Sequence, residues 1–147
     1  MNYYLDMIRT AEEKDTKAVQ ELIELLEDCT FDSENFARIF RDQLADERWT
    51  CFVYEKEGEI LACLNMRMEE QLHHCAKVAQ ILELIVKEDK RCQGIGAQLF
   101  RAACDHASEN GCVQVELETS SWRKRAHAFY EREGMNDDHS FFTMKLK

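Results

Sequence analysis

The chain has 147 residues, of which 45% are hydrophobic and 33% are charged, and this composition is typical of one soluble globular domain. Its formal net charge of −10 argues against a nucleic-acid partner, whose binding protein would be basic. The acidic surface is compatible with a cationic substrate such as an amine, although it also serves solubility alone. No signal peptide is visible, and no apolar run approaches the roughly 18 residues that span a membrane. We therefore expect a cytoplasmic protein without a membrane partner.

The seven cysteines form no Cys-x-x-Cys pair, and their odd count favours neither a disulfide framework nor a structural zinc site. We interpret them as reduced thiols, mostly buried as small apolar residues. His73, His74 and Cys75 are adjacent in a polar stretch and would make a poor metal cage, so we predict no metal.

Hydrophobic periodicity divides the chain into strands with a period of two residues and helices with a period near 3.6. In chain order we expect a strand at 3–9, helices at 16–28 and 33–45, strands at 49–56, 59–68 and 78–86, a helix at 94–110, a strand at 113–119, a helix at 123–132 and a strand at 140–146. Ser33 is the expected N-cap of the second helix, and residues 69–77 read as a polar loop. The order β-α-α-β-β-β-α-β-α-β has no repeat and no linker, which predicts a single α/β domain over residues 1–147.

A glycine-containing turn joins the strand at 78–86 to the following helix. It reads Arg91-x-x-Gly94-x-Gly96. The first turn of a helix has N–H groups without partners and a partial positive charge, so it favours an anion such as a phosphate. Glycines let the backbone approach that ligand without Cβ clashes. A dinucleotide fingerprint would need a third glycine at Leu99, and a Walker loop would need Gly-Lys-Ser/Thr after Gly96. The alternative is a strand-to-helix turn without a ligand.

Two motifs together resemble those of the GCN5-related N-acetyltransferase (GNAT) family. The glycine turn is similar to the acetyl-CoA pyrophosphate loop of that family. The second motif, Ala126-x-x-Phe129-Tyr130-Glu131-x-x-Gly134-Met135, is similar to the family's other signature. The resemblance is close over an acetyl-CoA-binding core at about 78–135, and it rests on element order alone before that. It implies a GNAT-like mixed, mostly antiparallel sheet flanked by helices.

Acetyl transfer from a thioester to an amine needs a proton acceptor for the amine and benefits from a proton donor for the leaving thiolate. The resemblance assigns the donor role to Tyr130, whose alternative role is packing against the sheet. For the base we propose Glu83, because a carboxylate inside the apolar strand Ile81–Val86 is costly to bury without a partner or a function. Its alternatives are a solvent-facing carboxylate or one paired with a core histidine. Glu118 is the reserve candidate.

The resemblance also implies where acetyl-CoA binds. Main-chain groups of Leu84, Ile85 and Val86 would pair with the pantetheine arm. Backbone amides of the turn would hold the pyrophosphate, from Arg91, Cys92, Gln93, Gly94, Ile95, Gly96 and Ala97. Arg123 stands near the place where family members often carry a pantetheine-contacting Asn, which puts that contact in doubt. Cys92 lies inside the phosphate turn, a poor place for a nucleophile, so we expect direct transfer.

We therefore expect an acetyl-CoA-dependent N-acetyltransferase whose acceptor is the primary amine of a small molecule or amino-acid derivative. A protein N-terminus or lysine is the variant within this class. The rival is a regulatory module that binds acyl-CoA without transfer. Acceptor specificity is expected in the first two helices and in residues 69–77. The sequence leaves the oligomeric state open. A homodimer is possible, because dimers are common among proteins of this kind.

Overall fold

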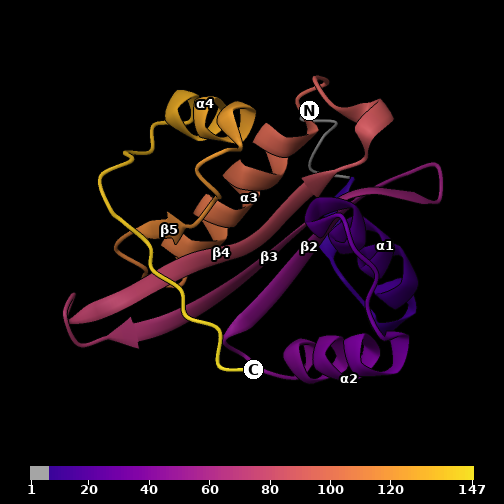
Figure 1. The fold of residues 1–147 in the computed structure, drawn as a ribbon, viewed down its shortest axis with the longest axis horizontal. Coiled ribbons are helices and arrows are strands. Elements are labelled where there is room, and N and C mark those ends of the chain that lie inside the picture. Colours follow the sequence, from indigo (N-terminus) through magenta and orange to yellow (C-terminus); the bar gives the residue numbers. More distant parts are fainter. Residues whose placement is uncertain (1–6) are drawn as a thin grey trace. The chain divides into compact units, whose positions relative to one another are not determined.

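A computed structural model describes residues 7–147, and most of its elements follow the predicted order (Figure 1). The elements are β1 (Ile8–Thr10), the 3₁₀ turn η1 (Glu13–Asp15), α1 (Thr16–Glu27), α2 (Ser33–Leu44), β2 (Trp49–Lys56), β3 (Glu59–Gln71), β4 (Ala76–Val86), the 3₁₀ turn η2 (Glu88–Lys90), α3 (Ile95–Glu109), β5 (Val115–Leu117) and α4 (Lys124–Arg132). The sheet has the strand order β1-β2-β3-β4-β5, and β1 to β4 pair antiparallel. The chain divides into two compact units, one reaching to Glu116 and the other running from Leu117 to Lys147.

The hairpin between β3 and β4 is longer than the sequence predicts. Residues 69–77 were expected as a polar loop, but the strands pair as far as Gln71 and Ala76. Only Leu72–Cys75 form the turn, in which the N–H of Cys75 donates to the carbonyl of Leu72 at 3.1 Å. The expectation was wrong because a strand is held by main-chain hydrogen bonds, which polar side chains also permit once the partner strand is in place.

The predicted strand at 140–146 is absent. Residues 135–147 form no helix or strand, and Phe142, Met144 and Leu146 are 90%, 84% and 89% exposed. Alternating apolar residues form a strand only when a neighbouring strand accepts their hydrogen bonds. The unit from Leu117 onward contains only the end of β5 and α4, so the pattern has no partner there.

Three smaller expectations also change. The first strand was expected at 3–9 and is observed at Ile8–Thr10, while residues 3–6 lie outside the described part of the chain. Asp32, not Ser33, caps α2, because its carboxylate accepts a hydrogen bond from the N–H of Asn35 at 3.1 Å. Only two of the seven cysteines, Cys51 and Cys63, are buried. The expectation of mostly buried thiols was therefore wrong.

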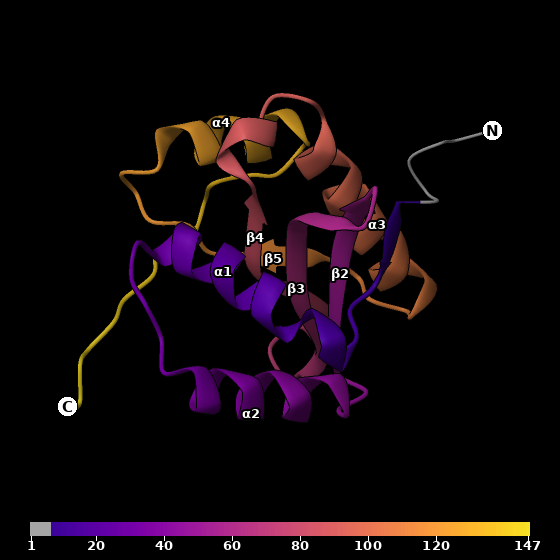
Figure 2. The same ribbon diagram turned by 90° about the vertical axis from the view of Figure 1, so that its right-hand side faces the viewer.

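The two faces of the sheet carry different helices (Figure 2). On one face, apolar residues of α1 and α2 pack against β2, β3 and β4 in one core cluster that includes Val19, Leu22, Ile23, Phe40, Cys51, Val53, Cys63 and Ile85. On the other face lies α3. Its His106 approaches the hydroxyl of Thr50 at 3.1 Å and meets the ring of Phe52 edge-on at 5.4 Å. Successive residues of β2 thus alternate between the two helical layers.

A bulge in β4 decides which face the carboxylate of Glu83 occupies. Asn65 pairs with Glu83, but the next residue of β3, Met66, pairs with Ile81, so Leu82 is an extra residue in β4. Because side chains alternate between faces, one inserted residue reverses the alternation beyond it. Glu83 therefore shares the face of Asn65, beneath α1 and α2, while Ile81 shares the face of Met66.

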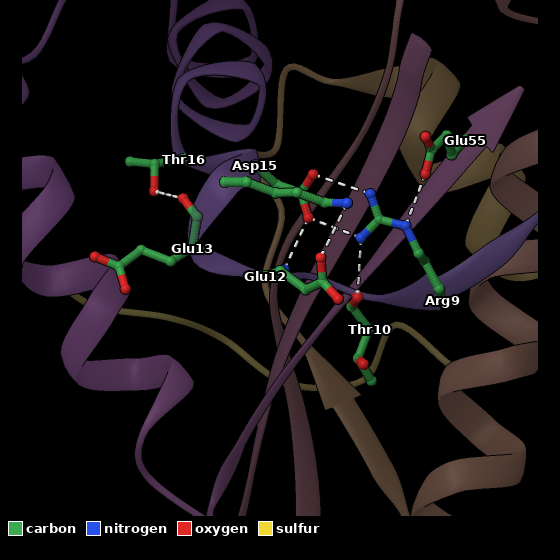
Figure 3. A network of polar contacts seen from close by, with 8 residues as sticks. Arg9, Thr10, Glu12, Glu13, Asp15, Thr16 and Glu55 are labelled. Atoms are coloured by element: carbon green, nitrogen blue, oxygen red, sulfur yellow. Dashed lines mark hydrogen bonds and ion pairs between the residues drawn. The ribbon is translucent and has the colours of Figure 1, made fainter. Parts of the chain in front are cut away.

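An ion-pair network fixes the turn between β1 and α1 (Figure 3). The guanidinium of Arg9 donates to both carboxylate oxygens of Asp15, at 2.7 and 2.9 Å, and its Nε donates to Glu55 at 2.7 Å. Asp15 also accepts the backbone N–H of Glu12 at 2.8 Å. Asp15 is only 5% exposed, and the hydrogen bond from Arg9 holds the pKa of its carboxyl below its usual range. The network joins β1, η1 and β2 just before α1 begins.

Replacing Asp15 with Asn should lower the free energy of unfolding at pH 7 by about 3 kcal/mol, because Arg9 would lose its buried counter-charge. Since the pKa of Asp15 is depressed, this contribution is present above the unfolded carboxyl pKa of about 3.9 and is lost as the pH falls below it. Denaturant unfolding at pH 7 and at pH 3 measures both effects. The matched control is Asp42→Asn in the exposed Arg38–Asp42 pair, which should cost at most about 0.5 kcal/mol. Equal losses for the two variants would contradict this account.

Candidate functional site

The carboxylate of Glu83 belongs to a series of side-chain hydrogen bonds that runs from the sheet to α2. The amide nitrogen of Asn65 donates to Glu83 Oε2 at 3.0 Å and to Gln43 Oε1 at 3.0 Å. The first contact follows from the register of β3 and β4, which places Asn65 and Glu83 directly opposite each other. The second requires α2 to lie over the same face. Sheet and helix thus converge on one carboxylate.

Two cavities meet at these polar groups, and both are lined by Phe40, Gln43, Cys51 and Asn65. The first, of about 80 Å³, reaches Glu83 and is otherwise walled by Val19, Ile23, Phe36 and Ile39. The second, of about 190 Å³, extends toward β1 and the beginning of β2 and is walled by Thr10, Ala11, Leu44, Trp49 and Thr50. Among the lining residues, Glu83 alone is charged. The pair of cavities therefore offers a carboxylate at the end of a mostly uncharged pocket.

Burial raises the pKa of Glu83, and the negative charge of Glu27 on α1 raises it further, whereas the hydrogen bond from Asn65 lowers it. The Glu83 carboxylate therefore has a higher proton affinity than an exposed glutamate. A carboxyl group with a raised pKa is better matched to proton transfer near neutral pH. Glu118, the reserve candidate, is exposed and lacks this desolvation.

The thiol beside Glu83 is not activated. Burial raises the pKa of Cys51, which lines both cavities, to about 12, and it also raises the pKa of Cys63. Both groups are therefore neutral thiols at physiological pH, and a neutral thiol is a poor nucleophile. Cys92 is exposed in the glycine turn. Besides burial, the charges that act on the Cys51 thiol among residues 7–147 are those of Glu83 and Asp15, and both disfavour a thiolate.

The backbone of the predicted anion-binding turn adopts a conformation that favours glycine at position 94. Gly94 is the N-cap of α3 with φ of +81°, in the left-handed region that favours glycine. Cys92 also has a positive φ, of 66°. Arg91 donates from its Nε to the carbonyl of Val86 at 3.2 Å, so its side chain ties the turn to the end of β4. Ile95 is buried and anchors the first turn of α3.

The other predicted cofactor-binding residues lie where this turn begins and ends. Leu84, Ile85 and Val86 form the end of β4, where they pair with Leu64, Cys63 and Ala62 of β3. β4 has 11 residues, whereas β5 has three, and hydrogen bonds join Lys77 and Ala79 at the beginning of β4 to the segment before β5. Gln93, Gly96 and Ala97 complete the turn and the first turn of α3. Glu83 directly precedes Leu84, so the candidate base and the predicted pantetheine contacts lie on one strand that leads to the turn.

Tyr130 lies on α4, in the unit that begins at Leu117. Burial raises the pKa of its phenol to about 12, against a lowering influence of Arg123. The hydroxyl therefore keeps its proton at neutral pH and can act as a donor. Arg123 is the N-cap residue of α4, and its guanidinium lies over the ring of Trp122 at 4.9 Å. This stacking gives Arg123 a role within its own turn.

Sequence reasoning missed Asn65 and Gln43. Asn65 stands among apolar residues of a predicted strand, the same signal that singled out Glu83. Gln43 had no signal, because an amide near the end of an amphipathic helix is an ordinary surface residue. A further polar pair lies on the same sheet face, where the guanidinium of Arg67 stacks over Trp49 at 5.4 Å and forms an ion pair with Glu69.

Within residues 7–147, no group of three or more His, Cys, Asp or Glu side chains is arranged to hold a metal ion. His74 instead faces Glu116, with 3.6 Å between Nε2 and Oε1. No helix in the same part of the chain is long and apolar enough to cross a membrane.

Comparison with known proteins connects this geometry to a family. The profile of the acetyltransferase (GNAT) family matches residues 18–135. An aminoalkylphosphonate N-acetyltransferase from Salmonella typhimurium is 35% identical over 140 residues, which are 95% of this chain and 90% of that protein. Among solved structures, a putative acetyltransferase from Agrobacterium tumefaciens has a TM-score of 0.85 at 25% identity, covering 95% of this chain and 99% of that one. A transcriptional regulator from Bacillus halodurans has a TM-score of 0.87 at 25% identity, covering 95% and 98%.

Proposed function

Because the chain belongs to the GNAT family and is an N-acetyltransferase, we propose that it transfers an acetyl group from acetyl-CoA directly to the primary amine of a small molecule. The observation that carries the proposal is the partly buried Glu83 carboxylate, which lines a cavity and precedes the strand end and glycine turn of the family's cofactor-binding motif. Acetyl-CoA supplies the activated acetyl group. The residues of this chain supply binding, orientation and proton transfer.

The glycine turn fits a pyrophosphate. The first N–H groups of α3 have no partner within the helix, and the helix dipole adds positive potential at the same place. The left-handed backbone at Gly94 opens the turn without a side chain on the approach side. We assign the pyrophosphate to the amides from Arg91 to Ala97 and the pantetheine arm to main-chain groups of Leu84–Val86. The side chain of Arg91 already donates to Val86, so it positions the turn.

Two side chains move the protons of the reaction. Glu83 accepts a proton from the ammonium form of the amine, directly or through a water, so that the neutral nitrogen can form a bond to the acetyl carbon. A backbone N–H at Leu84–Val86 faces the carbonyl oxygen as negative charge develops on it. When the carbon–sulfur bond breaks, Tyr130 donates its phenolic proton to the leaving thiolate, and the second proton that the nitrogen loses as it becomes an amide restores the phenol through water. Because no thiolate lies beside Glu83, the acetyl group passes to the amine without an enzyme-bound intermediate.

The acceptor is a small molecule rather than a protein segment. Two cavities of about 80 and 190 Å³ suit an aliphatic amine, and one end of the pair carries the carboxylate. The Salmonella relative is named for aminoalkylphosphonates, which makes them the first acceptors to examine. On the same face of the sheet, Arg67 is the cation available for the anionic end of such a molecule, although Glu69 shares its charge.

Turnover on an amine panel tests the proposed function. The panel should contain aminoalkylphosphonates, phosphonate-free alkylamines of equal length, amino-acid amides and a lysine-containing peptide, with release of free CoA thiol as the readout. Acetylation of a small amine in preference to the peptide is the expected result. Preference for the peptide would move the enzyme to the protein-modifying variant of its class. Binding of acetyl-CoA without turnover on any amine would favour the regulatory module.

The substitution Gly94→Glu should abolish acetyl-CoA binding, because it drives a carboxylate against the pyrophosphate. Gly111→Glu is the matched control, since Gly111 has φ of +82° against +81° for Gly94 and carries the same backbone strain at the other end of α3. In a thermal melt, acetyl-CoA at 100 times its Kd should stabilise the wild type and Gly111→Glu by about 2.7 kcal/mol, and Gly94→Glu not at all. Stabilisation of Gly94→Glu by acetyl-CoA would remove the turn from the binding site.

The substitution Tyr130→Phe should lower kcat at least about tenfold while KM for acetyl-CoA changes little, since the hydroxyl acts on the leaving thiolate during transfer. Tyr54→Phe, which removes the hydroxyl of a buried tyrosine on β2, is the control and should leave kcat unchanged. Steady-state kinetics with the preferred amine measures both. An unchanged kcat in Tyr130→Phe would take this residue out of the mechanism.

A further inference from the structure

The side-chain hydrogen bonds that link Gln43, Asn65 and Glu83 do more than join α2 to the sheet. We propose that Asn65 is a positioning residue that turns one oxygen of Glu83 away and presents the other, together with its own Oδ1, to an ammonium group in the cavity. The inference rests on the proposed function, because it concerns the amine end of the same site. It assigns recognition of the amine to a side chain on β3 that lies outside both sequence motifs.

The orientation of the Asn65 amide is determined by its partners. A side-chain amide has two N–H donors on nitrogen and acceptor lone pairs on oxygen. At Asn65 the nitrogen faces two oxygens, Gln43 Oε1 and Glu83 Oε2, each at 3.0 Å. A flipped amide would set its oxygen against a carboxylate, which is repulsive. Both donors are therefore used, and the remaining polar atom, Oδ1, can only accept.

The resulting lining selects a particular ligand chemistry. Within residues 7–147, no donor is hydrogen-bonded to Glu83 Oε1 or to Asn65 Oδ1, and both residues line the smaller cavity. Two acceptors, one of them charged, fit the N–H groups of a primary ammonium ion. An acceptor with a tertiary or quaternary nitrogen has one N–H group or none to offer them. The site therefore favours a nitrogen with at least two N–H groups, as in a primary alkylammonium, and holds it next to the oxygen that accepts its proton.

The same contact controls the ionisation of the base. The groups that surround Glu83 come from each neighbouring element: Glu27 from α1, the neutral thiol of Cys51 from β2, and the neutral thiol of Cys63 and the amide of Asn65 from β3, while α2 contributes the neutral Gln43. Glu27 and Asn65 shift the pKa of Glu83, whereas the two thiols are themselves influenced by its charge. Asn65 alone among them lowers the pKa of Glu83. Loss of its donor raises that pKa, so the base form is reached only at a higher pH.

Kinetics of Asn65→Leu across pH tests the inference. We expect the acidic limb of kcat/KM for the amine to move upward by at least about half a pH unit, with kcat/KM at pH 7 falling roughly tenfold and KM for acetyl-CoA changing less than about twofold. The pKa of the free amine is the same for every variant, so any shift belongs to the protein. An unmoved limb, or an equal loss of acetyl-CoA affinity, would overturn the positioning role.

Two further variants keep the test sharp if Asn65→Leu folds poorly. Gln43→Leu removes only the contact from α2, and it should lower kcat/KM for the amine by roughly threefold without changing KM for acetyl-CoA. Gln20→Leu is the matched control, because the Gln20 amide also donates to a carboxylate, that of Glu24, and joins α1 to Ser33 of α2 without touching Glu83. Gln20→Leu should behave as the wild type. Equal effects of both glutamine substitutions would overturn the inference.

A measurement without turnover separates this inference from the proposed function. Carbon-13 NMR of the Glu83 carboxyl, titrated in the unliganded protein and assigned by its loss in Glu83→Gln, reports the contact with Asn65 directly. A higher Glu83 pKa in Asn65→Leu is expected, and an unchanged pKa would overturn the inference whatever the amine panel gives. If the Glu83 pKa is higher in Asn65→Leu as expected but the wild type acetylates no amine, the inference stands and the proposed function is contradicted.

Discussion

The pairing of β3 with β4, with its one extra residue at Leu82, is the constraint on which the site depends. The two strands are the longest in the sheet and connect the layer under α1 and α2 to the glycine turn at Gly94. Without the extra residue, the carboxylate of Glu83 would share the face of Ile81, where α3 packs. With it, Glu83 stands opposite Asn65 and lines the smaller cavity. A local irregularity in hydrogen bonding thus decides on which face of the sheet the proposed base lies.

The wall of the larger cavity depends on a second constraint, the network around Arg9. Thr10 and Ala11 line the larger cavity, and the bidentate pair between Arg9 and Asp15 fixes the chain on either side of them. A buried ion pair seldom adds net stability relative to apolar packing, but it is costly to break and permits few alternative arrangements. Its role here is to hold the short connection from β1 to α1 in one geometry. The cavity then keeps its shape as α1 continues over the sheet.

The position of Glu83 lowers the stability of the fold and raises the proton affinity of its carboxylate. Its pKa is raised, so ionisation of the carboxyl costs stability as the pH rises from the unfolded pKa through the folded one. The hydrogen bond from Asn65 offsets part of this cost. A fully solvated carboxylate would avoid the cost, but it would bind its proton less tightly and would be a weaker base. Partial burial with one hydrogen bond from Asn65 is a compromise between these limits.

The sequence by itself determined the helices α1 to α4, the strand β2, the glycine turn and the family, because periodicity and local motifs are properties of neighbouring residues. It also singled out Glu83, since a charge within an apolar strand is visible in one dimension. It could not determine the face on which Glu83 lies, because the bulge at Leu82 depends on hydrogen bonds to β3. Asn65 and Gln43 are distant in sequence, so only tertiary structure brings them together. For residues 140–146 the sequence predicted a strand that does not form. A period of two indicates side chains suited to a strand, but it does not show whether a neighbouring strand is present to form the hydrogen bonds.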